Sequence, residues 1–529
     1  MQRRLHTRPG QGMARGMVPA KRAKAVGVEL PEGASGSTFL LEILAHAVNA
    51  FPSVFQNVKI PSDSRRFRST FGTVLTQFEA ARVASDERVA IASAIRSRVA
   101  ERMRFVSEDE SRTLADALSR KVAPIPVRVV KTTGPGRLVP AVQFGDAVGD
   151  AAALRVWLSA ARLQHQMTDA AVRALGKILD RADAENGLSL AGERFVVMGA
   201  GAELAPTEAL LAAGASVLWI DVREPSKALL ENCMLGGALH VPESTCDLLA
   251  SPAAIVATIA AFAGGESVHL GMYAYAGGES QEWRLAESMN AIAAALPPGM
   301  VKSISLLVSP TTVIAAHPAD VEAGAQRRQD AGTLMRSLAH FGFLEPSHVS
   351  SPSSSSVTSA IVGLQGASYQ AAQYVGKLLA AEVFGVSGIN ALGPLTTSAN
   401  IAPITATRSL SHPLFEAGFL FAPNFGVWVA KPETTRALHA LLMIADVTDE
   451  EAPAAAGRVY ESKSKRAAAL FTEQVHGGVY AQPYALEGII RIAALGGLRQ
   501  KPSLLAKLVR SIELEALLRR SLSQPSDAR

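Results

Sequence analysis

Short apolar runs alternate with helix-like segments between residues 194 and 309, and this alternation is the feature that most restricts the fold. The apolar runs cover residues 194–198, 216–221, 267–275 and 301–309, with helical patterns at 203–213, 225–234, 252–263 and 281–296. Strands separated by helices of this length predict a parallel sheet with right-handed crossovers and helices on both faces. We therefore expect an α/β fold with a doubly wound, Rossmann-like sheet, in which the four apolar runs are parallel neighbours.

The length of the chain predicts further regions on both sides of this sheet. A chain of 529 residues exceeds one ordinary domain. Residues 36–188 carry mostly helical patterns and predict a mainly helical N-terminal domain beside a Rossmann-like domain at 190–430. Residues 431–529 predict a helical C-terminal region. The serine-rich stretch 345–360 and the segment 388–426 are expected to be loops.

Residues 1–35 are expected to form a separate basic segment. Up to residue 28 they contain seven lysines or arginines, and the first acid is Glu29. A basic head of this kind is either a disordered tail or an organelle transit segment. Two cysteines in the whole chain fit a reducing compartment. We expect a cytoplasmic protein, with a mitochondrion or plastid as the alternative location.

The composition excludes several classes of function. An apolar share of 48% supports a large core, while 5% aromatic residues disfavour a protein that binds nucleic acid by base stacking. The eleven histidines are scattered and form no His-x-x-x-His pair, so no metal site is predicted. No window is apolar enough for an integral membrane segment. The predicted partner is a small-molecule substrate, and homo-oligomer formation stays open.

The turn after the first strand has the residues of a nucleotide-binding loop. In "RFVVMGAGAELAPTEALLAAGASVLWIDV" the strand ends at Gly199, and Gly201 and Ala202 follow. Two glycines at this spacing allow a sharp bend and a close approach of the backbone to a diphosphate. Asp221 closes the second strand, where a carboxylate can accept hydrogen bonds from ribose hydroxyls. Tyr273 leaves a later strand at its carboxyl end, where ligands dock in such sheets.

This strand–turn–strand–Asp layout resembles the short-chain dehydrogenases and related nicotinamide-binding proteins, in the central region of the chain. The resemblance implies NAD as the cofactor because Asp221 would repel a 2′-phosphate, although Arg223 leaves NADP open. The layout also resembles the first motif of S-adenosylmethionine-dependent methyltransferases. Glu203 and Met198 depart from that motif, which usually has a glycine and an acid at these positions.

The resemblance to short-chain dehydrogenases also implies a catalytic serine, tyrosine and lysine. "SLLVSPTT" puts Ser309 after a strand, and "ASYQAAQYVGKLLAAE" resembles the tyrosine helix with Tyr369 as its tyrosine. In that family the tyrosine donates a proton to the carbonyl while the lysine lowers its pKa. Gln373 stands at the usual lysine position, and Lys377 follows one turn later. The predicted catalytic residues are Ser309, Tyr369 and Lys377.

These observations predict an NAD(P)-dependent oxidoreductase that acts on a small carbonyl or alcohol. A non-catalytic nucleotide-binding or scaffold protein on the same fold is one alternative, and an S-adenosylmethionine-dependent methyltransferase is another. The hydroxyl-rich segment 396–413 is treated as a loop that could line the pocket with Thr396, Thr397, Asn400 and His412.

Overall fold

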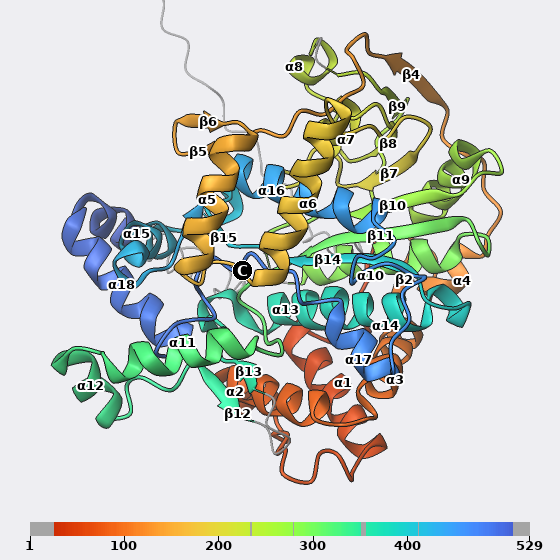
Figure 1. Cartoon of the computed structure of the whole chain (residues 1–529). Coiled ribbons are helices and arrows are strands. Elements are labelled where there is room, and N and C mark those ends of the chain that lie inside the picture. Colours follow the sequence, from red (N-terminus) through yellow and green to blue (C-terminus); the bar gives the residue numbers. More distant parts are fainter. Residues whose placement is uncertain (1–25, 233–234, 279, 351–355, 411, 511–529) are drawn as a thin grey trace, which may run out of the picture.

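The computed structural model describes residues 26–232, 235–278, 280–350, 356–410 and 412–510, and a seven-stranded sheet runs through this part of the chain (Figure 1). Its strand order is β14-β11-β10-β7-β8-β9-β4. The strands are β4 (Val127–Lys131), β7 (Arg194–Met198), β8 (Ser216–Ile220), β9 (Ala238–Pro242), β10 (Val268–Met272), β11 (Val301–Val308) and β14 (Thr396–Ile401). All neighbours are parallel except β4, which pairs antiparallel with β9.

Counted from β7, the parallel strands follow the order 3-2-1-4-5-6, which is the doubly wound Rossmann order. The predicted parallel arrangement of the four apolar runs is confirmed. The strand order reverses between β7 and β10. The carboxyl ends of these two strands therefore flank the crevice in which open α/β sheets bind their ligands.

Both faces of the sheet are buried, which explains why its strands are apolar runs without a polar alternation. Val196 and Leu218 belong to one hydrophobic core, while the adjacent Phe195 and Val217 belong to another on the opposite face. One face is covered by α5 (Ala151–Leu163), α6 (Asp169–Glu185), α7 (Thr207–Ala212) and α16 (Pro432–Thr448). The other face is covered by α9 (Pro252–Ala263), α10 (Gln281–Ala295) and the helical segment 366–387.

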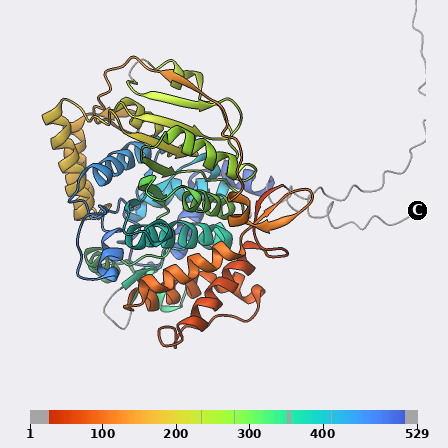
Figure 2. The same ribbon diagram turned by 90° about the vertical axis from the view of Figure 1, so that its right-hand side faces the viewer.

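The N-terminal helices form a further layer beneath segment 366–387, and both views show it (Figures 1 and 2). They are α1 (Gly36–Ala50), α2 (Ser64–Val83) and α3 (Arg88–Arg102). Phe78 and Ile95 of this layer share one hydrophobic core with Ile304 of the sheet. In addition, β4 lies within the expected N-terminal domain but joins the central sheet. The boundary expected near residue 188 therefore does not separate two hydrophobic cores.

The remaining described elements are short or peripheral. The helices are α4 (Leu114–Leu118), α8 (Lys227–Leu230), α11 (Pro318–Gln329), α12 (Thr333–His340), α15 (Pro413–Phe421), α17 (Lys463–Ala469) and α18 (Leu486–Gln500). Two further strand pairs are β5 (Val142–Phe144) with β6 (Ala147–Gly149) and β15 (Ile404–Thr405) with β16 (Val429–Ala430). None of the helices in the described ranges is long and apolar enough to cross a membrane.

Part of the expected N-terminal tail belongs to the fold. Residues 1–25 lie outside the described residues, but β1 (Gly27–Glu29) pairs with β2 (Arg104–Val106), which pairs with β3 (Ser111–Thr113). Val28 is fully buried. The expectation that the basic segment extends to residue 35 is therefore wrong for residues 26–35, because β1 supplies an apolar side chain to the core.

Two expected loops contain strands. Within 345–360, β12 (His348–Ser350) and β13 (Ser356–Thr358) form an antiparallel pair, and residues 351–355 lie outside the described part. Within 388–426, the sheet gains β14. The sequence of β14, "TTSANI", lacks the apolar run typical of a buried strand. Its polar side chains are buried because Ser398 and Asn400 donate hydrogen bonds to Asp446 of α16.

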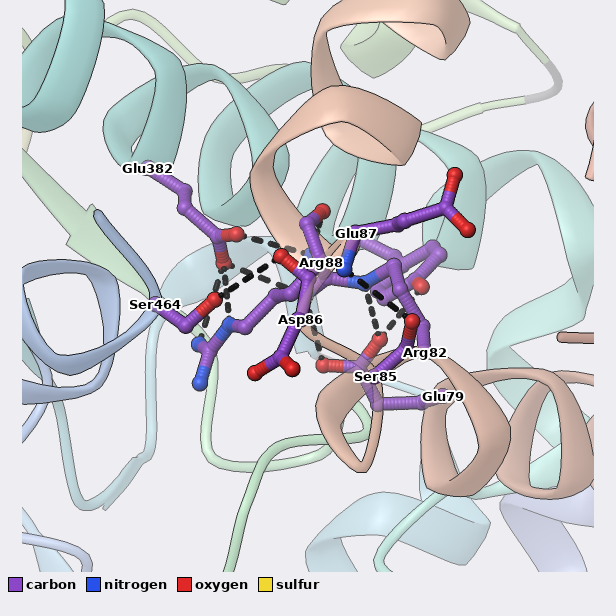
Figure 3. Close-up of polar contacts among 9 residues, drawn as sticks. Glu79, Arg82, Ser85, Asp86, Glu87, Arg88, Glu382 and Ser464 are labelled. Atoms are coloured by element: carbon purple, nitrogen blue, oxygen red, sulfur yellow. Dashed lines mark hydrogen bonds and ion pairs between the residues drawn. The ribbon is translucent and has the colours of Figure 1, made fainter. Parts of the chain in front are cut away.

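A buried ionic cluster joins the N-terminal layer to segment 366–387 (Figure 3). Arg82 Nη1 lies 2.8 Å from Glu382 Oε1, and Arg88 Nη2 lies 3.0 Å from Glu382 Oε2. Arg82 also pairs with Glu79 at 2.7 Å. Burial alone would raise the pKa of Glu382, but the two arginines outweigh it and the pKa is lowered. The ion pairs of Glu382 stabilise the fold fully above the usual pKa of a glutamate. This stabilisation is lost as the pH falls through the lowered pKa of Glu382.

We predict that Glu382→Ala destabilises the protein by about 3–5 kcal/mol, because it leaves the buried Arg88 without its carboxylate and removes one of the two carboxylates that pair with the buried Arg82. The free energy of unfolding from denaturant titration measures this. The matched control is Glu42→Ala, which removes a partly exposed partner of Arg98 and should cost less than about 1 kcal/mol. Equal effects of the two substitutions would contradict the prediction.

Candidate functional site

A cavity of about 400 Å³ lies at the carboxyl edge of the central sheet. Its walls come from the segments that leave β10 and β11, from helical segment 366–387, from residues 402–410 and from α15 and α18. This is the position at which open α/β sheets bind ligands. The polar side chains that line it are Tyr273, Tyr275, Glu282, Ser309, Thr311, Gln365, Tyr369, Gln373, Lys377, Thr405, Thr407 and Ser409.

Tyr369 and Ser309 lie together in this cavity, although 59 other residues separate them in the chain. The Tyr369 hydroxyl is within hydrogen-bond reach of the side chains of Ser309 and Thr311. Ser309 Oγ lies 2.8 Å from Thr311 Oγ1. Burial raises the pKa of Tyr369 to about 12, and Glu282 contributes to the rise while the hydrogen bond from Ser309 opposes it. The tyrosine is therefore protonated at neutral pH.

Lys377 reaches the same wall of the cavity but contacts a carboxylate. Its Nζ lies 3.0 Å from Glu282 Oε1. Gln373, at the usual lysine position, donates from Nε2 to the same oxygen at 3.0 Å and accepts from the Ser309 backbone N at 3.1 Å. Gln373 thus connects Glu282 to the backbone of Ser309.

Glu282 is a site residue that the sequence interpretation missed. Its second oxygen, Oε2, accepts a hydrogen bond from the backbone N of Ala276 in the segment after β10. It stands at the start of α10, where an acid is common for reasons of helix stability alone, so nothing local distinguishes it. Only the packing of α10 against segment 366–387 brings it to Lys377 and Gln373.

The helix that carries these side chains has an unusual backbone. Segment 366–387 begins as α13 (Gly366–Gln370), continues as a π-helix over Ala371–Leu379 and ends as α14 (Ala380–Ser387). A π-helix of this length is rare, and π segments are frequent at functional sites. Gln373 and Lys377, four residues apart, lie on one side of this helix, and both reach Glu282 Oε1.

The turn after β7 bends sharply at Gly199, as the two glycines of its sequence predict. Gly199 has φ +83°, and a Cβ there would lie 2.3 Å from the backbone N of Ala274. Gly199 therefore makes the tight turn, and a larger side chain would collide with the segment after β10. Gly201 is exposed, and Ala202 N donates to Gly199 O at 3.0 Å.

Asp221 is held beside this turn at the end of β8. Its Oδ2 accepts from Gly201 N at 2.9 Å, and its Oδ1 accepts from Arg223 N at 3.0 Å. Asp221 is half-buried, and Arg223 is exposed. An exposed glycine next to an oriented carboxylate fits the ribose and phosphate of a dinucleotide. These residues suit a dinucleotide, whereas Leu204 replaces the third glycine of such a loop and Glu203 adds a carboxylate to the same turn.

The other predicted residues are placed as follows. Tyr273 lines the cavity but is buried, and its hydroxyl reaches Ser305 of β11, inside the sheet. Thr397 and Asn400 are buried within β14, so the expectation that they lie on a pocket-lining loop is wrong. Neither Thr396 nor His412 is among the residues that line the cavity.

In the described ranges, no group of three or more His, Cys, Asp or Glu side chains is placed to hold a metal ion.

Comparisons with known proteins give little further information. No family model matches the chain, and no curated protein matches it. One solved structure that matches is a short-chain type dehydrogenase/reductase from Mycobacterium marinum. It shares 13% sequence identity and a TM-score of 0.32, over 55% of this chain and 96% of that one. This similarity is too low to support a statement about activity, and the assignment of the fold rests on the strand order.

We predict that Glu282→Gln lowers the pKa of Tyr369 from its raised value of about 12, because a negative charge near the hydroxyl is removed. A pH titration followed by NMR of ring-labelled tyrosine measures this, with Tyr369→Phe to assign the signal. Glu461→Gln changes an exposed acid that pairs with Lys465, and it should leave the pKa unchanged. An unchanged pKa in Glu282→Gln would contradict the prediction.

Proposed function

We propose that this chain is an NAD(P)-dependent oxidoreductase that acts on a small, mainly apolar carbonyl or alcohol. The observation that supports this most is the contact between Tyr369 and Ser309 in a cavity at the carboxyl edge of a Rossmann-type sheet. A proton donor beside a second hydroxyl can protonate and orient the oxygen of a carbonyl substrate.

In this proposal Tyr369 donates the proton to the substrate oxygen, and Ser309 orients that oxygen by a hydrogen bond. A pKa of about 12 keeps Tyr369 protonated at neutral pH, and the protonated hydroxyl is the form that can donate to a carbonyl oxygen. Gln373 is a positioning residue because it holds the backbone of Ser309. Lys377 is neutralised by Glu282, so it activates Tyr369 less than a free lysine would.

The cofactor would lie along the glycine turn. Gly199, Gly201 and Ala202 would shape the loop around the diphosphate, and Asp221 would accept hydrogen bonds from the ribose. When bound, NAD(P) supplies the hydride chemistry that the side chains lack. Asp221 favours NAD, while the exposed Arg223 keeps NADP binding open.

The lining of the cavity supports a neutral substrate. The two charged side chains that line it, Glu282 and Lys377, pair with each other. The apolar part of the wall includes Phe415 and Phe419 of α15 and Ile490 of α18. An apolar cavity with a few convergent polar groups is typical of a small-molecule site.

The oxidoreductase proposal predicts that Tyr369→Phe lowers kcat/KM for reduction of a small aldehyde or ketone by about 10²- to 10⁴-fold, because the proton donor is lost. Consumption of NADH or NADPH across a panel of apolar carbonyls measures this. Tyr460→Phe, which removes a hydroxyl bonded to Pro453 O outside the cavity, is the matched control. Full turnover by Tyr369→Phe would overturn the catalytic role of Tyr369.

The cofactor assignment predicts that Asp221→Ala weakens NAD binding by about 1–3 kcal/mol through lost hydrogen bonds to a charged group. Calorimetry with NAD and NADP measures it. Asp221→Asn is the control, because its amide oxygen can still accept from Gly201 N while the negative charge is gone. We expect Asp221→Asn to improve NADP binding relative to NAD. An unchanged ratio in both variants would place the ribose elsewhere.

A further inference from the structure

A carboxylate bridge crosses the mouth of the crevice next to the glycine turn. Glu203, in the turn between β7 and α7, accepts a hydrogen bond at Oε2 from the Tyr275 hydroxyl at 2.9 Å. The same oxygen accepts from the backbone N of Arg408 at 3.1 Å, and Oε1 lies 3.1 Å from Arg408 Nε. Three segments that are far apart in the chain therefore meet at one carboxylate.

The bridge lies where the fold predicts the path of a dinucleotide. Tyr275 belongs to the segment after β10 and Glu203 to the turn after β7, which are the two sides of the switch point in the strand order. Leu204, Thr407 and Ser409, the neighbours of Glu203 and Arg408 in sequence, line the cavity. The bridge therefore adjoins the cavity and spans its crevice.

The side chain of Glu203 can move while its backbone stays in place. Glu203 O accepts a hydrogen bond from Arg436 Nη1 at 3.2 Å, which ties the turn to α16. The Glu203 side chain is 20% exposed, and that of Arg408 is 89% exposed. An ion pair with one such exposed partner contributes little net stability, so a ligand of matching charge can displace it.

The two groups that hold Glu203 are also donors suited to phosphate. A guanidinium and a phenolic hydroxyl both donate hydrogen bonds to anionic oxygen, and arginine is favoured at phosphate sites. A phosphate that approached the glycine turn in the present structure would meet a carboxylate and be repelled. After Glu203 turned away, Tyr275 and Arg408 would face the same space with free donors.

We propose that Glu203 occupies the phosphate position of the crevice and that a diphosphate-bearing cofactor binds by displacing it from Tyr275 and Arg408. This inference rests on the proposed cofactor site. It assigns phosphate recognition to Tyr275 and Arg408, which lie outside the glycine turn. Glu203 is then the residue that limits cofactor affinity.

The test compares binding of ADP, NADH and adenosine to the full chain by calorimetry. Glu203→Gln should tighten ADP and NADH by about tenfold, because a like charge is removed from the phosphate position, and should leave adenosine unchanged. Arg408→Ala in the Glu203→Gln background should reverse this gain. Tyr275→Phe alone, which keeps the carboxylate, should not tighten ADP.

Equal ADP affinity of wild type and Glu203→Gln would overturn the inference, and so would absence of binding to both proteins. A similar gain for adenosine would also overturn it, because adenosine carries no phosphate. The oxidoreductase proposal fails separately, when Tyr369→Phe keeps full turnover. Tighter ADP binding by Glu203→Gln together with unaffected turnover in Tyr369→Phe would retain the phosphate site and reject the assigned chemistry.

Discussion

The buried pairing of Arg82 and Arg88 with Glu382 is the interaction on which the geometry of the candidate site depends most. Glu382 lies in α14, directly after the π-helix that carries Gln373 and Lys377. Charges buried this deeply are costly unless every partner is in place, so the cluster tolerates little change in the position of the helix. The N-terminal layer therefore holds the helix that forms one wall of the cavity.

A second ion pair holds α10, the helix that faces the π-helix across the cavity wall. Arg96 of α3 binds Glu287 of α10 at 2.6 Å, and α10 begins with the site residue Glu282. Both helices that supply the polar wall are thus fixed from the same layer. The expected mainly helical N-terminal domain has a direct structural role here, because its arginines set the distance between Glu282 and Lys377.

The site differs from the arrangement that the resemblance implies in the use of its charges. A lysine next to the tyrosine would lower its pKa, but here Gln373 takes that position and Lys377 is paired with Glu282. The raised pKa of Tyr369 follows from burial and from this carboxylate. Glu203 adds a carboxylate at the crevice. Each acid is matched by a nearby base, so the cavity is polar in places without a net charge on its walls.

The sequence by itself determined the local elements and the tight turn. The apolar runs specify β7, β8, β10 and β11 because a strand buried on both faces must be apolar along its length. The turn at Gly199 is also a local property, since its backbone requires a positive φ. The contact of Ser309 with Tyr369 was expected only through the resemblance of their segments to short-chain dehydrogenases, which implies a serine next to the tyrosine.

Only the tertiary structure decided the rest. The polar strand β14 is stable because Asp446, on a distant helix, accepts hydrogen bonds from its side chains. Glu282 and Glu203 gained their roles through partners from other segments, Lys377 for the first and Tyr275 and Arg408 for the second. Such contacts depend on how helices and loops pack against one another. A sequence pattern records which residues are buried or form a turn, but it does not record which distant residue meets them.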